Sequence, residues 1–561
     1  MGIAALLTLL CLNRLGASDV CGGSEAAMAV YVQQMVGHDQ ILFPLDNCTI
    51  PMYKPPLYHW TAAALAALLG NGTATAVNLR LPSALYAVGA AILTMAFTFN
   101  LLGASAANLA GLILCSSYQY VSQARIGLVD MTLTFCETLA LFSFFGWFAL
   151  ARGASDAAWR RTLMHYLLAL AMGLGVLAKG PIGALLPGSA ILLFLLAEDR
   201  TALLMLFKAG PLVLGIAIAS SWYLSCFFGR RYNFLHLQIG VENFGRFFGS
   251  LGNMPAWYYV QPLLLNSLPL SLFVPLAVLT ALVPKRSARP QSSAAPSSPM
   301  DTSPRSDARA TDSDPASFRT TPSSSSQLLP SGDSAVQADR SLLATLAARL
   351  LAIFWVFSVA FFDFAAFKRR AYLLPLWPAS AYLLAWWTME HILPSICVRL
   401  RTVVYRLVIT TCLLLATANF LFIPAYELHQ CGAPFTLDSL LQWSSTGFMG
   451  ESFASSNQTK SYRAAAAQIN RFTPSDTRLY WFGFQDALEP LIFYLDRCAL
   501  PLSASLPVPA DAWVITPVSA WTPVRSRFPN LTPWARISYD HDALILLRTS
   551  GVATRPGVGR K

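Results

Sequence analysis

The sequence has little charge. Of its 561 residues, 12% are Asp, Glu, Lys or Arg and 55% are hydrophobic, which gives a mean hydropathy of +0.50. A soluble globular protein carries about 25% charged residues. Half that share, combined with long apolar runs, indicates a multi-spanning membrane protein and argues against an ordinary soluble fold.

Several functional patterns are also missing. The ten cysteines form no CxxC pair and no Cys/His cluster with zinc spacing, so we expect no metal framework. The chain contains no GxxxxGK[ST], HExxH, GxSxG or EF-hand pattern, which leaves the corresponding classes of hydrolase and calcium-binding protein without support. The net charge of +11 lies largely in short segments between apolar runs, as expected of cytoplasmic loops, and does not predict nucleic-acid binding.

Four cysteines lie in polar regions of the chain, namely Cys21, Cys48, Cys431 and Cys498. Disulfides form in oxidising compartments. If these regions face such a compartment, we expect a Cys21–Cys48 disulfide.

The apolar runs predict membrane-spanning helices, each of which needs roughly 20 residues. Met1–Ala17 is interpreted as a first anchor, with a signal peptide as the alternative, and Leu57–Leu69 as an interfacial or re-entrant helix. The other predicted spans are Leu81–Leu102, Ala104–Val121, Leu128–Leu150, Leu163–Leu177, Ile182–Ala197, Leu206–Phe227, Trp257–Val283, Leu343–Phe362, Tyr372–Met389 and Val403–Ile423. We therefore predict a mainly α, polytopic membrane protein with about 11–13 transmembrane helices.

Basic residues predict the orientation. Arginine and lysine clusters after Leu150, after Val283 and before Val403 fall on one side in this scheme, and the positive-inside rule assigns that side to the cytoplasm. The loops 18–56 and 228–256, and everything after Ile423, then face outward.

Composition divides the chain into four parts. Ser287–Arg340 is rich in Ser, Pro, Ala and Asp and is predicted to be a disordered linker. The tail is predicted to be a small outward α/β domain, with strands at Leu479–Gly483 and Ala512–Ile515 and a helix at Ser461–Phe472. The predicted parts are an N-terminal transmembrane catalytic region (1–284), the cytoplasmic linker (285–342), the C-terminal transmembrane helices (343–423) and the periplasmic domain (424–561).

Cations recur at outward helix ends, where the positive-inside rule does not favour them. They are Lys54, Arg125, Lys179, Arg246 and the triplet Lys368–Arg370. Any one of them could be a long side chain that reaches the lipid headgroups. Together they predict a cationic pocket at the membrane surface, suited to a phosphate or pyrophosphate group.

Acidic residues lie close to these cations in the sequence. Asp130 begins a predicted span, where a carboxylate is costly and is often functional; helix capping is the alternative. Glu25 follows the first anchor, and its alternative is a first-turn partner of the helix dipole. These groups permit substitution at a carbon that bears a phosphate leaving group, with cations stabilising the phosphate and a carboxylate acting as general base.

The order of motifs resembles a known superfamily. An acidic motif after the first helix is followed by the stretch MYKPPLYHW around Lys54, and the chain matches the pattern from about Cys21 to Trp386. The further matching stretches are Asn78–Ser83, Ala124–Asp130, Leu177–Pro181, Glu242–Phe247 and Tyr372–Ala379. This pattern resembles the bacterial membrane glycosyltransferases related to the lipid A 4-amino-4-deoxy-L-arabinose transferases and the protein O-mannosyltransferases.

The resemblance implies a GT-C fold with an outward active site and a polyprenyl-phosphate-linked sugar as donor. The acidic motif of the superfamily, usually Asp-Glu, supplies the proposed base, and here it reads Ser24-Glu25. Glu25 or Asp130 is therefore the expected base. Lys54 matches the lysine that contacts the donor phosphate, and Arg246 matches an arginine of the later loop. Tyr372 matches a tyrosine near the donor.

The resemblance also bears on metal binding. In the aminoarabinose branch, a glutamate before the lysine and a histidine in the later loop bind a metal. Tyr53 and Asn243 occupy those two positions here, so we expect that metal site to be lost and no cofactor to be required.

The predicted function is transfer of a sugar from a polyprenyl-phosphate carrier to a lipid, glycan or protein acceptor at the periplasmic face of the inner membrane. The predicted donor-phosphate ligands are Lys54, Arg125, Lys179, Arg246, Lys368 and Tyr372. The alternative is a transporter or flippase of lipid-linked sugars, although the sequence shows no repeat symmetry or broken midplane helices typical of transporters.

Overall fold

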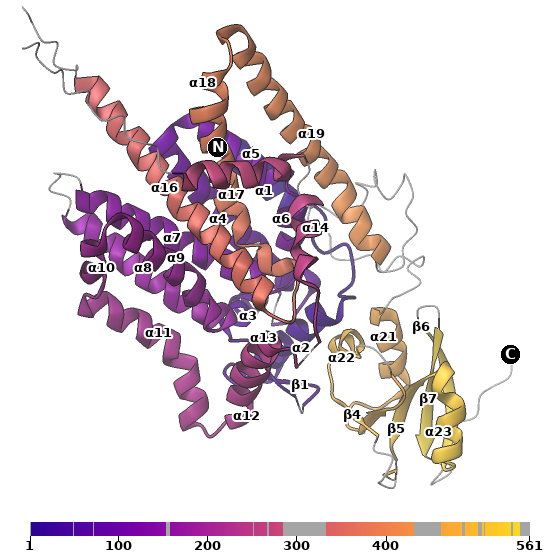
Figure 1. Cartoon of the computed structure of the whole chain (residues 1–561). Coiled ribbons are helices and arrows are strands. Elements are labelled where there is room, and N and C mark those ends of the chain that lie inside the picture. The colour runs from indigo at the N-terminus through magenta and orange to yellow at the C-terminus, as the bar shows by residue number, and fades with distance from the viewer. Residues whose placement is uncertain are drawn as a thin grey trace, which may run out of the picture.

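A computed structural model describes most of the chain. The described residues are 2–48, 50–70, 72–152, 158–250, 252–265, 269–283, 332–430, 462–484, 488–502, 508–509, 511–539 and 542–549. Most of the predicted linker (285–342) and residues 431–461 of the predicted periplasmic domain (424–561) lie outside these residues, whereas residues 424–430 of that predicted domain are described and are helical. Figure 1 shows a large helical bundle with a separate sheet-containing domain beside one end of it.

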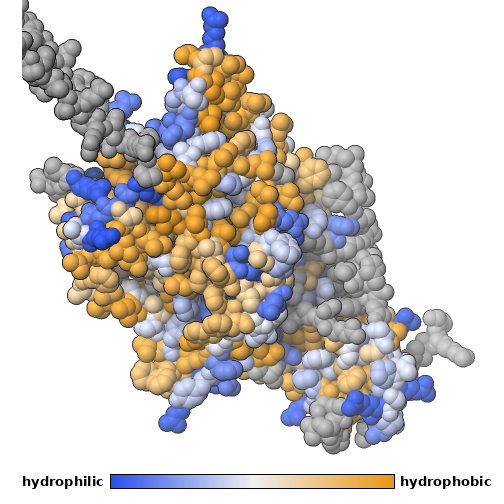
Figure 2. Space-filling model, in the orientation of Figure 1, coloured by the Kyte–Doolittle hydropathy of each residue, from blue (hydrophilic) through white to orange (hydrophobic). Residues whose placement is uncertain are grey.

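Six described helices are long and apolar enough to cross a membrane. They are α4 (Ala76–Leu102), α7 (Asp130–Arg152), α8 (Ala158–Lys179), α11 (Ala209–Phe228), α16 (Gly332–Phe364) and α19 (Val398–Gln430). Each coincides with a span predicted from the sequence. The chain is a multi-pass membrane protein, and the apolar surface over the helical bundle in Figure 2 agrees with this.

Shorter helices complete the bundle. They are α1 (Gly2–Leu12), α2 (Gly23–Gly37), α3 (Leu57–Leu69), α5 (Ala104–Ser116), α6 (Tyr118–Ala124), α9 (Ile182–Glu198), α10 (Arg200–Leu206), α12 (Tyr232–Leu235), α13 (Arg246–Phe248), α14 (Val260–Leu265), α15 (Val274–Leu282), α17 (Leu376–Trp387) and α18 (Leu393–Ser395). Tighter or wider helical turns are the 3-10 helices η2 (Ala256–Tyr259), η3 (Leu270–Phe273) and η4 (Arg370–Leu373), and the π-helices η1 (His236–Gly245) and η5 (Thr388–Ile392). The bounds predicted for α3 are confirmed.

Three predicted spans are interrupted. Ala104–Val121 is divided at Ser117, whose hydroxyl accepts the Tyr120 amide (3.3 Å) and so starts the new helix α6. Trp257–Val283 contains several prolines and is divided into η2, α14, η3 and α15. Tyr372–Met389 begins in η4 and ends in the π-helix η5.

The end of the predicted linker differs from the prediction. Helix α16 begins at Gly332, so its first residues are helical where a disordered linker was predicted through 342. The remainder of the linker, residues 285–331, falls outside the described residues.

The C-terminal α/β domain is confirmed. Its five-stranded sheet has the order β4-β3-β5-β7-β6, with β3 parallel to β4 and β5, and with β7 antiparallel to β5 and β6. Its elements are α21 (Tyr462–Phe472), β3 (Leu479–Trp481), α22 (Glu489–Leu495), β4 (Ala499–Pro501), β5 (Trp513–Pro517), the 3-10 turn η6 (Val518–Ala520), α23 (Trp521–Arg527), β6 (Leu531–Tyr539) and β7 (Asp542–Thr549).

This domain shares a core with the segment after α1. Residues of α2 and α3, such as Tyr31 and Tyr58, belong to one buried cluster with Leu491 of α22 and Ile515 of β5. A small hairpin between α2 and α3, formed by β1 (Leu45–Asp46) and β2 (Ile50–Pro51), lies at the same contact. The domain is therefore held against the loop 18–56.

A disulfide joins these two parts, and it corrects the predicted pairing. Cys48 is bonded to Cys498, 450 residues further along the chain, so the predicted Cys21–Cys48 bond is wrong. Next to it, the Asn47 side chain accepts the amide of Ala499 at 2.7 Å. Sequence could not reveal this pairing because the fold brings together two distant segments.

Candidate active site

Lys54 is placed by the segment between the hairpin and α3. Pro55 and Pro56 follow it and restrict the backbone where the chain enters α3. The lysine side chain is 12% exposed, and its ammonium pairs with the carboxylate of Glu242. The lysine of the stretch MYKPPLYHW therefore points inward, toward Glu242, which lies 188 residues further along the chain.

The loop 228–256 supplies the next two groups. Glu242 lies on the π-helix η1, and Arg246 begins α13 one turn later. Oε1 of Glu242 lies 2.7 Å from Nη2 of Arg246, which also donates through Nη1 to the hydroxyl of Tyr372 at 3.2 Å. One carboxylate therefore holds two cations, and one of those cations reaches Tyr372.

Backbone hydrogen bonds fix this loop on the segment between α16 and η4. The carbonyl groups of Arg246 and Phe247 accept the amides of Phe367 and Ala366, at 3.2 and 3.0 Å. The amide of Met254 donates to the carbonyl of Ala366 at 2.8 Å. This pairing brings Arg246 and Tyr372, which are far apart in sequence, to one place.

Lys179 completes the arrangement from the bundle side. It is the last residue of α8, and the chain turns there through Gly180, whose φ of +93° favours glycine. Its ammonium pairs with Asp130 at the start of α7 and lies 4.6 Å from the centre of the Tyr372 ring. Lys54, Lys179 and Arg246 with Asp130, Glu242 and Tyr372 are called the cation cluster below.

Charge is only partly balanced in the cation cluster, which holds three cations and two carboxylates. Burial lowers the pKa of the Lys54 ammonium to about 8, against the attraction of Glu242. Burial also acts to lower the pKa of Arg246, but Tyr372 and Glu242 outweigh it and raise that pKa. Arg246 is thus a permanent cation, whereas Lys54 loses its charge as the pH rises through about 8.

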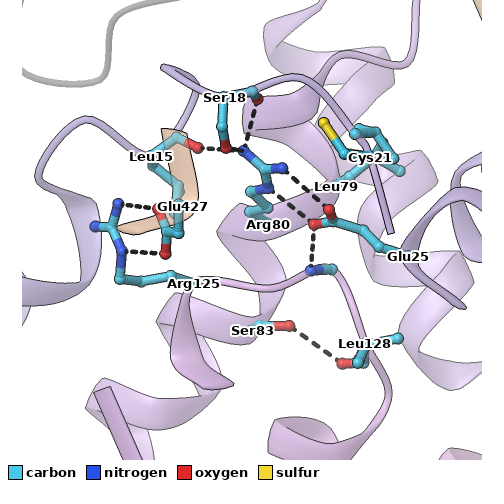
Figure 3. A network of polar contacts seen from close by, with 12 residues as sticks. Leu15, Ser18, Cys21, Glu25, Leu79, Arg80, Ser83, Arg125, Leu128 and Glu427 are labelled. Atoms are coloured by element: carbon cyan, nitrogen blue, oxygen red, sulfur yellow. Dashed lines mark hydrogen bonds and ion pairs between the residues drawn. The ribbon is translucent and has the colours of Figure 1, made fainter. Parts of the chain in front are cut away.

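Glu25 lies in a separate network (Figure 3). Its carboxylate receives Nε and Nη2 of Arg80, at 2.8 and 3.0 Å, and the amide of Gly127 at 2.8 Å. Arg80 also donates to the carbonyl groups of Leu15 and Ser18. A side chain at Gly127 would place its Cβ 2.8 Å from the Tyr58 hydroxyl, so only glycine fits this close approach. Glu25 therefore links α2, α4 and the loop before α7.

Arg125 belongs neither to the Glu25–Arg80 ion pair nor to the cation cluster. It is 1% exposed and makes two 2.8 Å bonds to the carboxylate of Glu427, near the end of α19 (Figure 3). Its Nη1 donates to backbone carbonyls of Leu10 and Cys11 at the end of α1 and to that of Asn13, just after it, at 2.5 Å. The contacts fasten α19 to the N-terminal part of the chain.

Removing the partner of this buried arginine should destabilise the protein strongly. We expect Glu427→Ala to lower the free energy of unfolding by about 3–5 kcal/mol, because it leaves an uncompensated charge in the interior. Thermal unfolding of the purified protein in detergent measures the effect. As a control, Asp511→Asn removes the charged partner of Arg548 from an exposed pair and keeps a side chain that tolerates the positive φ of residue 511; it should cost less than about 1 kcal/mol, and equal losses would contradict the structural role.

Lys368 is also held away from the cluster. It is 3% exposed and donates to the backbone carbonyls of Asp363 and Ala365, the latter at 2.8 Å. The neighbouring Arg369 is exposed and lies 3.4 Å from the hydroxyl of Ser24. Of the six predicted phosphate ligands, the structure thus brings together Lys54, Lys179, Arg246 and Tyr372, and it places Arg125 and Lys368 elsewhere.

Tyr53 and Asn243 occupy the two positions at which the sequence resemblance predicts the loss of a metal site. Burial and the nearby Glu242 carboxylate raise the pKa of the Tyr53 hydroxyl above its ordinary value, so it stays a neutral phenol. The Asn243 amide donates to the carbonyl of Gln238 at 2.6 Å. Within the described residues, no group of three or more His, Cys, Asp or Glu side chains could hold a metal ion.

Two side chains in these ion pairs, Glu242 and Arg80, were not selected as candidates from the sequence. Glu242 was quoted only as part of a motif, although its spacing of four residues from Arg246 predicts an ion pair on a helix. Arg80 was likewise part of a quoted stretch, and its position directly before the predicted span Leu81–Leu102 was a signal of function or pairing. The pairing of Glu242 with Lys54 and that of Arg80 with Glu25 could not be predicted from the sequence.

Comparisons with known proteins find this chain similar to proteins named as sugar transferases. Residues 38–231 match the family of dolichyl-phosphate-mannose-protein mannosyltransferases. The crystal structure of ArnT from Cupriavidus metallidurans bound to undecaprenyl phosphate superposes with a TM-score of 0.66 at 16% identity, over 97% of this chain and 96% of that chain. The chain thus has the GT-C fold, and the predicted relation to the aminoarabinose transferases and the O-mannosyltransferases is confirmed.

Curated relatives match over shorter regions. A protein of Aquifex aeolicus is 27% identical over 274 residues, which is 48% of this chain and 52% of the relative. The undecaprenyl phosphate-α-4-amino-4-deoxy-L-arabinose arabinosyl transferase of Pectobacterium carotovorum is 28% identical over 184 residues, or 32% of each chain. The matches therefore span 52% and 32% of the length of these two curated relatives.

Proposed function

We propose that the chain is a membrane glycosyltransferase that moves a sugar from a polyprenyl-phosphate carrier to an acceptor. The observation that carries this proposal is the convergence of Lys54, Lys179, Arg246 and Tyr372, from four separate segments, on one partly shielded site. The names of the related proteins, which use undecaprenyl or dolichyl phosphate sugars, support the same donor class.

The cation cluster suits the departing phosphate. During transfer, the acceptor oxygen forms a bond to the anomeric carbon, and the bond from that carbon to the carrier phosphate breaks. The electron pair leaves with the phosphate, so negative charge grows on its oxygens. Prepositioned cations such as Lys54 and Arg246 stabilise this charge more than that of the intact donor, which lowers the barrier.

We propose Asp130 as the general base for a hydroxyl acceptor. It is part of the cation cluster, where it pairs with Lys179, so it lies beside the position proposed for the donor phosphate. Glu25 already receives three N–H groups and is 9% exposed, which suits a positioning role. The proton of the acceptor hydroxyl would pass to Asp130 as the new glycosidic bond forms.

The proposed location is the inner membrane, with the active site and the C-terminal domain at the periplasmic face. The Cys48–Cys498 disulfide supports this side, because disulfides persist in oxidising compartments. It joins the C-terminal domain to the loop 18–56, which also carries Glu25 and Lys54. The positive-inside distribution of the sequence favours the same orientation.

We also propose that transfer needs no metal. The donor set at Tyr53 and Asn243 is a neutral phenol and an engaged amide, neither of which binds divalent ions well. Preincubation with EDTA followed by its removal should leave the initial rate within about twofold of the untreated protein, a difference too small to reflect a lost catalytic group. A large loss that zinc or magnesium restores would contradict this proposal.

The pH dependence should report the proton of Lys54. Since burial lowers its pKa to about 8 beside Glu242, Arg246 and Lys179, the free protein loses this cation as pH rises above that value. We expect kcat/KM for the donor to fall about tenfold per pH unit above roughly pH 8. Lys54→Arg stays protonated and should lack this alkaline limb; an identical profile in that variant would assign the limb to another group.

The proposed function is tested by incubating the purified protein in detergent with labelled polyprenyl-phosphate sugars and candidate lipid, glycan and protein acceptors. A transferase releases the carrier phosphate and labels an acceptor. A flippase would bind the same donor and yield neither product, so this assay separates the two functions.

A further inference from the structure

We propose that Glu242 is an internal counter-anion of the donor site: its carboxylate holds Lys54 and Arg246 while no donor is bound, and it yields them to the entering phosphate. The inference rests on the proposed function, because it assumes that these two cations bind the carrier phosphate. It assigns to the loop 228–256 a role in setting how tightly the phosphate is held and how fast it leaves.

Glu242 contacts the two cations with different oxygens. Its Oε2 pairs with the Lys54 ammonium, and its Oε1 lies 2.7 Å from Nη2 of Arg246. A phosphate group that bridges a lysine and an arginine presents its oxygens in the same manner. The carboxylate therefore lies where a phosphate shared by these two cations would lie.

Because the site is shielded from water, the Glu242 carboxylate and an entering phosphate compete for the same two cations. The exposed side-chain fractions are 12% for Lys54, 8% for Glu242 and 13% for Arg246. Two neighbouring cations in such a shielded place are costly without an anion, so Glu242 stabilises the empty site. Two anions side by side are also unfavourable, so an entering phosphate must displace Glu242 from at least one cation.

Glu242 is not needed to hold Arg246 in place. It lies on η1, and π-helical segments are rare and occur frequently at functional sites. Arg246 is fixed independently, since its carbonyl accepts the Phe367 amide at 3.2 Å and its guanidinium bonds Tyr372. A shift of Glu242 would thus open the phosphate position without releasing Arg246.

The same carboxylate should assist product release. After transfer, the carrier is a phosphate monoester, which bears more negative charge than the donor diester and binds cations more strongly. Return of Glu242 to Lys54 and Arg246 competes with this product. We therefore expect Glu242→Gln to lower both KM for the donor and kcat, and to strengthen inhibition by the carrier phosphate, a combination that a purely structural defect would not produce.

Equilibrium binding to the purified full-length protein tests the inference. Undecaprenyl phosphate, undecaprenol and phosphatidylglycerol are titrated separately in detergent, and the bound fraction is followed by native mass spectrometry. At about pH 6, where Lys54 stays protonated even without the carboxylate that raises its pKa, Glu242→Gln should bind undecaprenyl phosphate about tenfold more tightly than wild type, within the usual range of coupling between sites. Its affinity for the other two lipids should not change.

Glu198→Gln is the matched control, because it removes a carboxylate from another partly buried ion pair, that with Arg349, and should bind like wild type. If Glu242→Gln does not purify as a folded protein, Glu242→Ala provides the same comparison. Unchanged or weaker phosphate binding by the folded variant overturns the inference, as does equal tightening for phosphatidylglycerol. If wild type itself does not prefer undecaprenyl phosphate to undecaprenol, the proposed function fails instead.

Discussion

Lys54→Ala should abolish sugar transfer while the protein still inserts and folds. The variant removes one of the cations that face the leaving phosphate, and loss of one such preorganised group costs about 10²–10³ in rate. Because Lys54 is shielded from water, its role cannot be taken over by solvent. We expect kcat to fall by about 10²–10³, measured as carrier phosphate released by the purified variant.

Lys208→Ala is the control for this experiment. Lys208 is exposed, between α10 and α11, and its loss should leave the rate unchanged. Unfolding temperature and gel-filtration profile establish that both variants are folded. Turnover by Lys54→Ala near that of wild type would remove Lys54 from the phosphate site and with it the proposed role of the cation cluster.

Asp130→Asn should cause the second large loss. The amide has nearly the same shape as the carboxylate, but it cannot accept the acceptor proton. General base catalysis contributes about 10²–10⁴ in rate, so we expect kcat to fall by that factor with a hydroxyl acceptor, whereas the affinity for undecaprenyl phosphate is kept. The rate is measured in single-turnover experiments at saturating donor, which separate the chemical step from product release and from any change in donor affinity that follows the loss of the Asp130–Lys179 pair.

Glu25→Gln is compared in the same assay, because the sequence left both carboxylates open as the base. Its expected effect is on stability, since Glu25 joins Arg80 to the Gly127 amide. The two variants then differ in kind: Asp130→Asn loses the chemical step, and Glu25→Gln lowers the unfolding temperature. The opposite pattern would assign the base to Glu25.

The fold was predictable where it depends on composition and local pattern. Long apolar runs located α4, α7, α8, α11, α16 and α19, because a membrane span needs continuous hydrophobicity. Short helices were harder. Ser117 divides one predicted span by capping a new helix, and such local hydrogen bonds do not reduce the hydrophobicity of the run.

The site was predictable in part. Position at outward helix ends identified Lys54, Lys179 and Arg246, since cations there run against the positive-inside rule. The same criterion also selected Arg125 and Lys368, which the structure pairs with Glu427 and with backbone carbonyls. The sequence does not distinguish a cation that binds a ligand from one that is paired within the protein, because the pairing partner lies on a distant element.

The features that the sequence did not predict depend on contacts between residues far apart in the chain. The Cys48–Cys498 disulfide and the Lys54–Glu242 pair join residues 450 and 188 positions apart. Nothing in the local sequence specifies such partners. They depend on the docking of the C-terminal domain against the loop 18–56 and of the loop 228–256 against the segment after α16.

The most direct test of the central claim is transfer in detergent with a labelled undecaprenyl-phosphate sugar. The account predicts that the purified protein releases undecaprenyl phosphate and labels an acceptor, and that Lys54→Ala under the same conditions does neither. A wild-type protein that binds the donor yet forms no product with any lipid, glycan or protein acceptor, and releases no carrier phosphate, would contradict it.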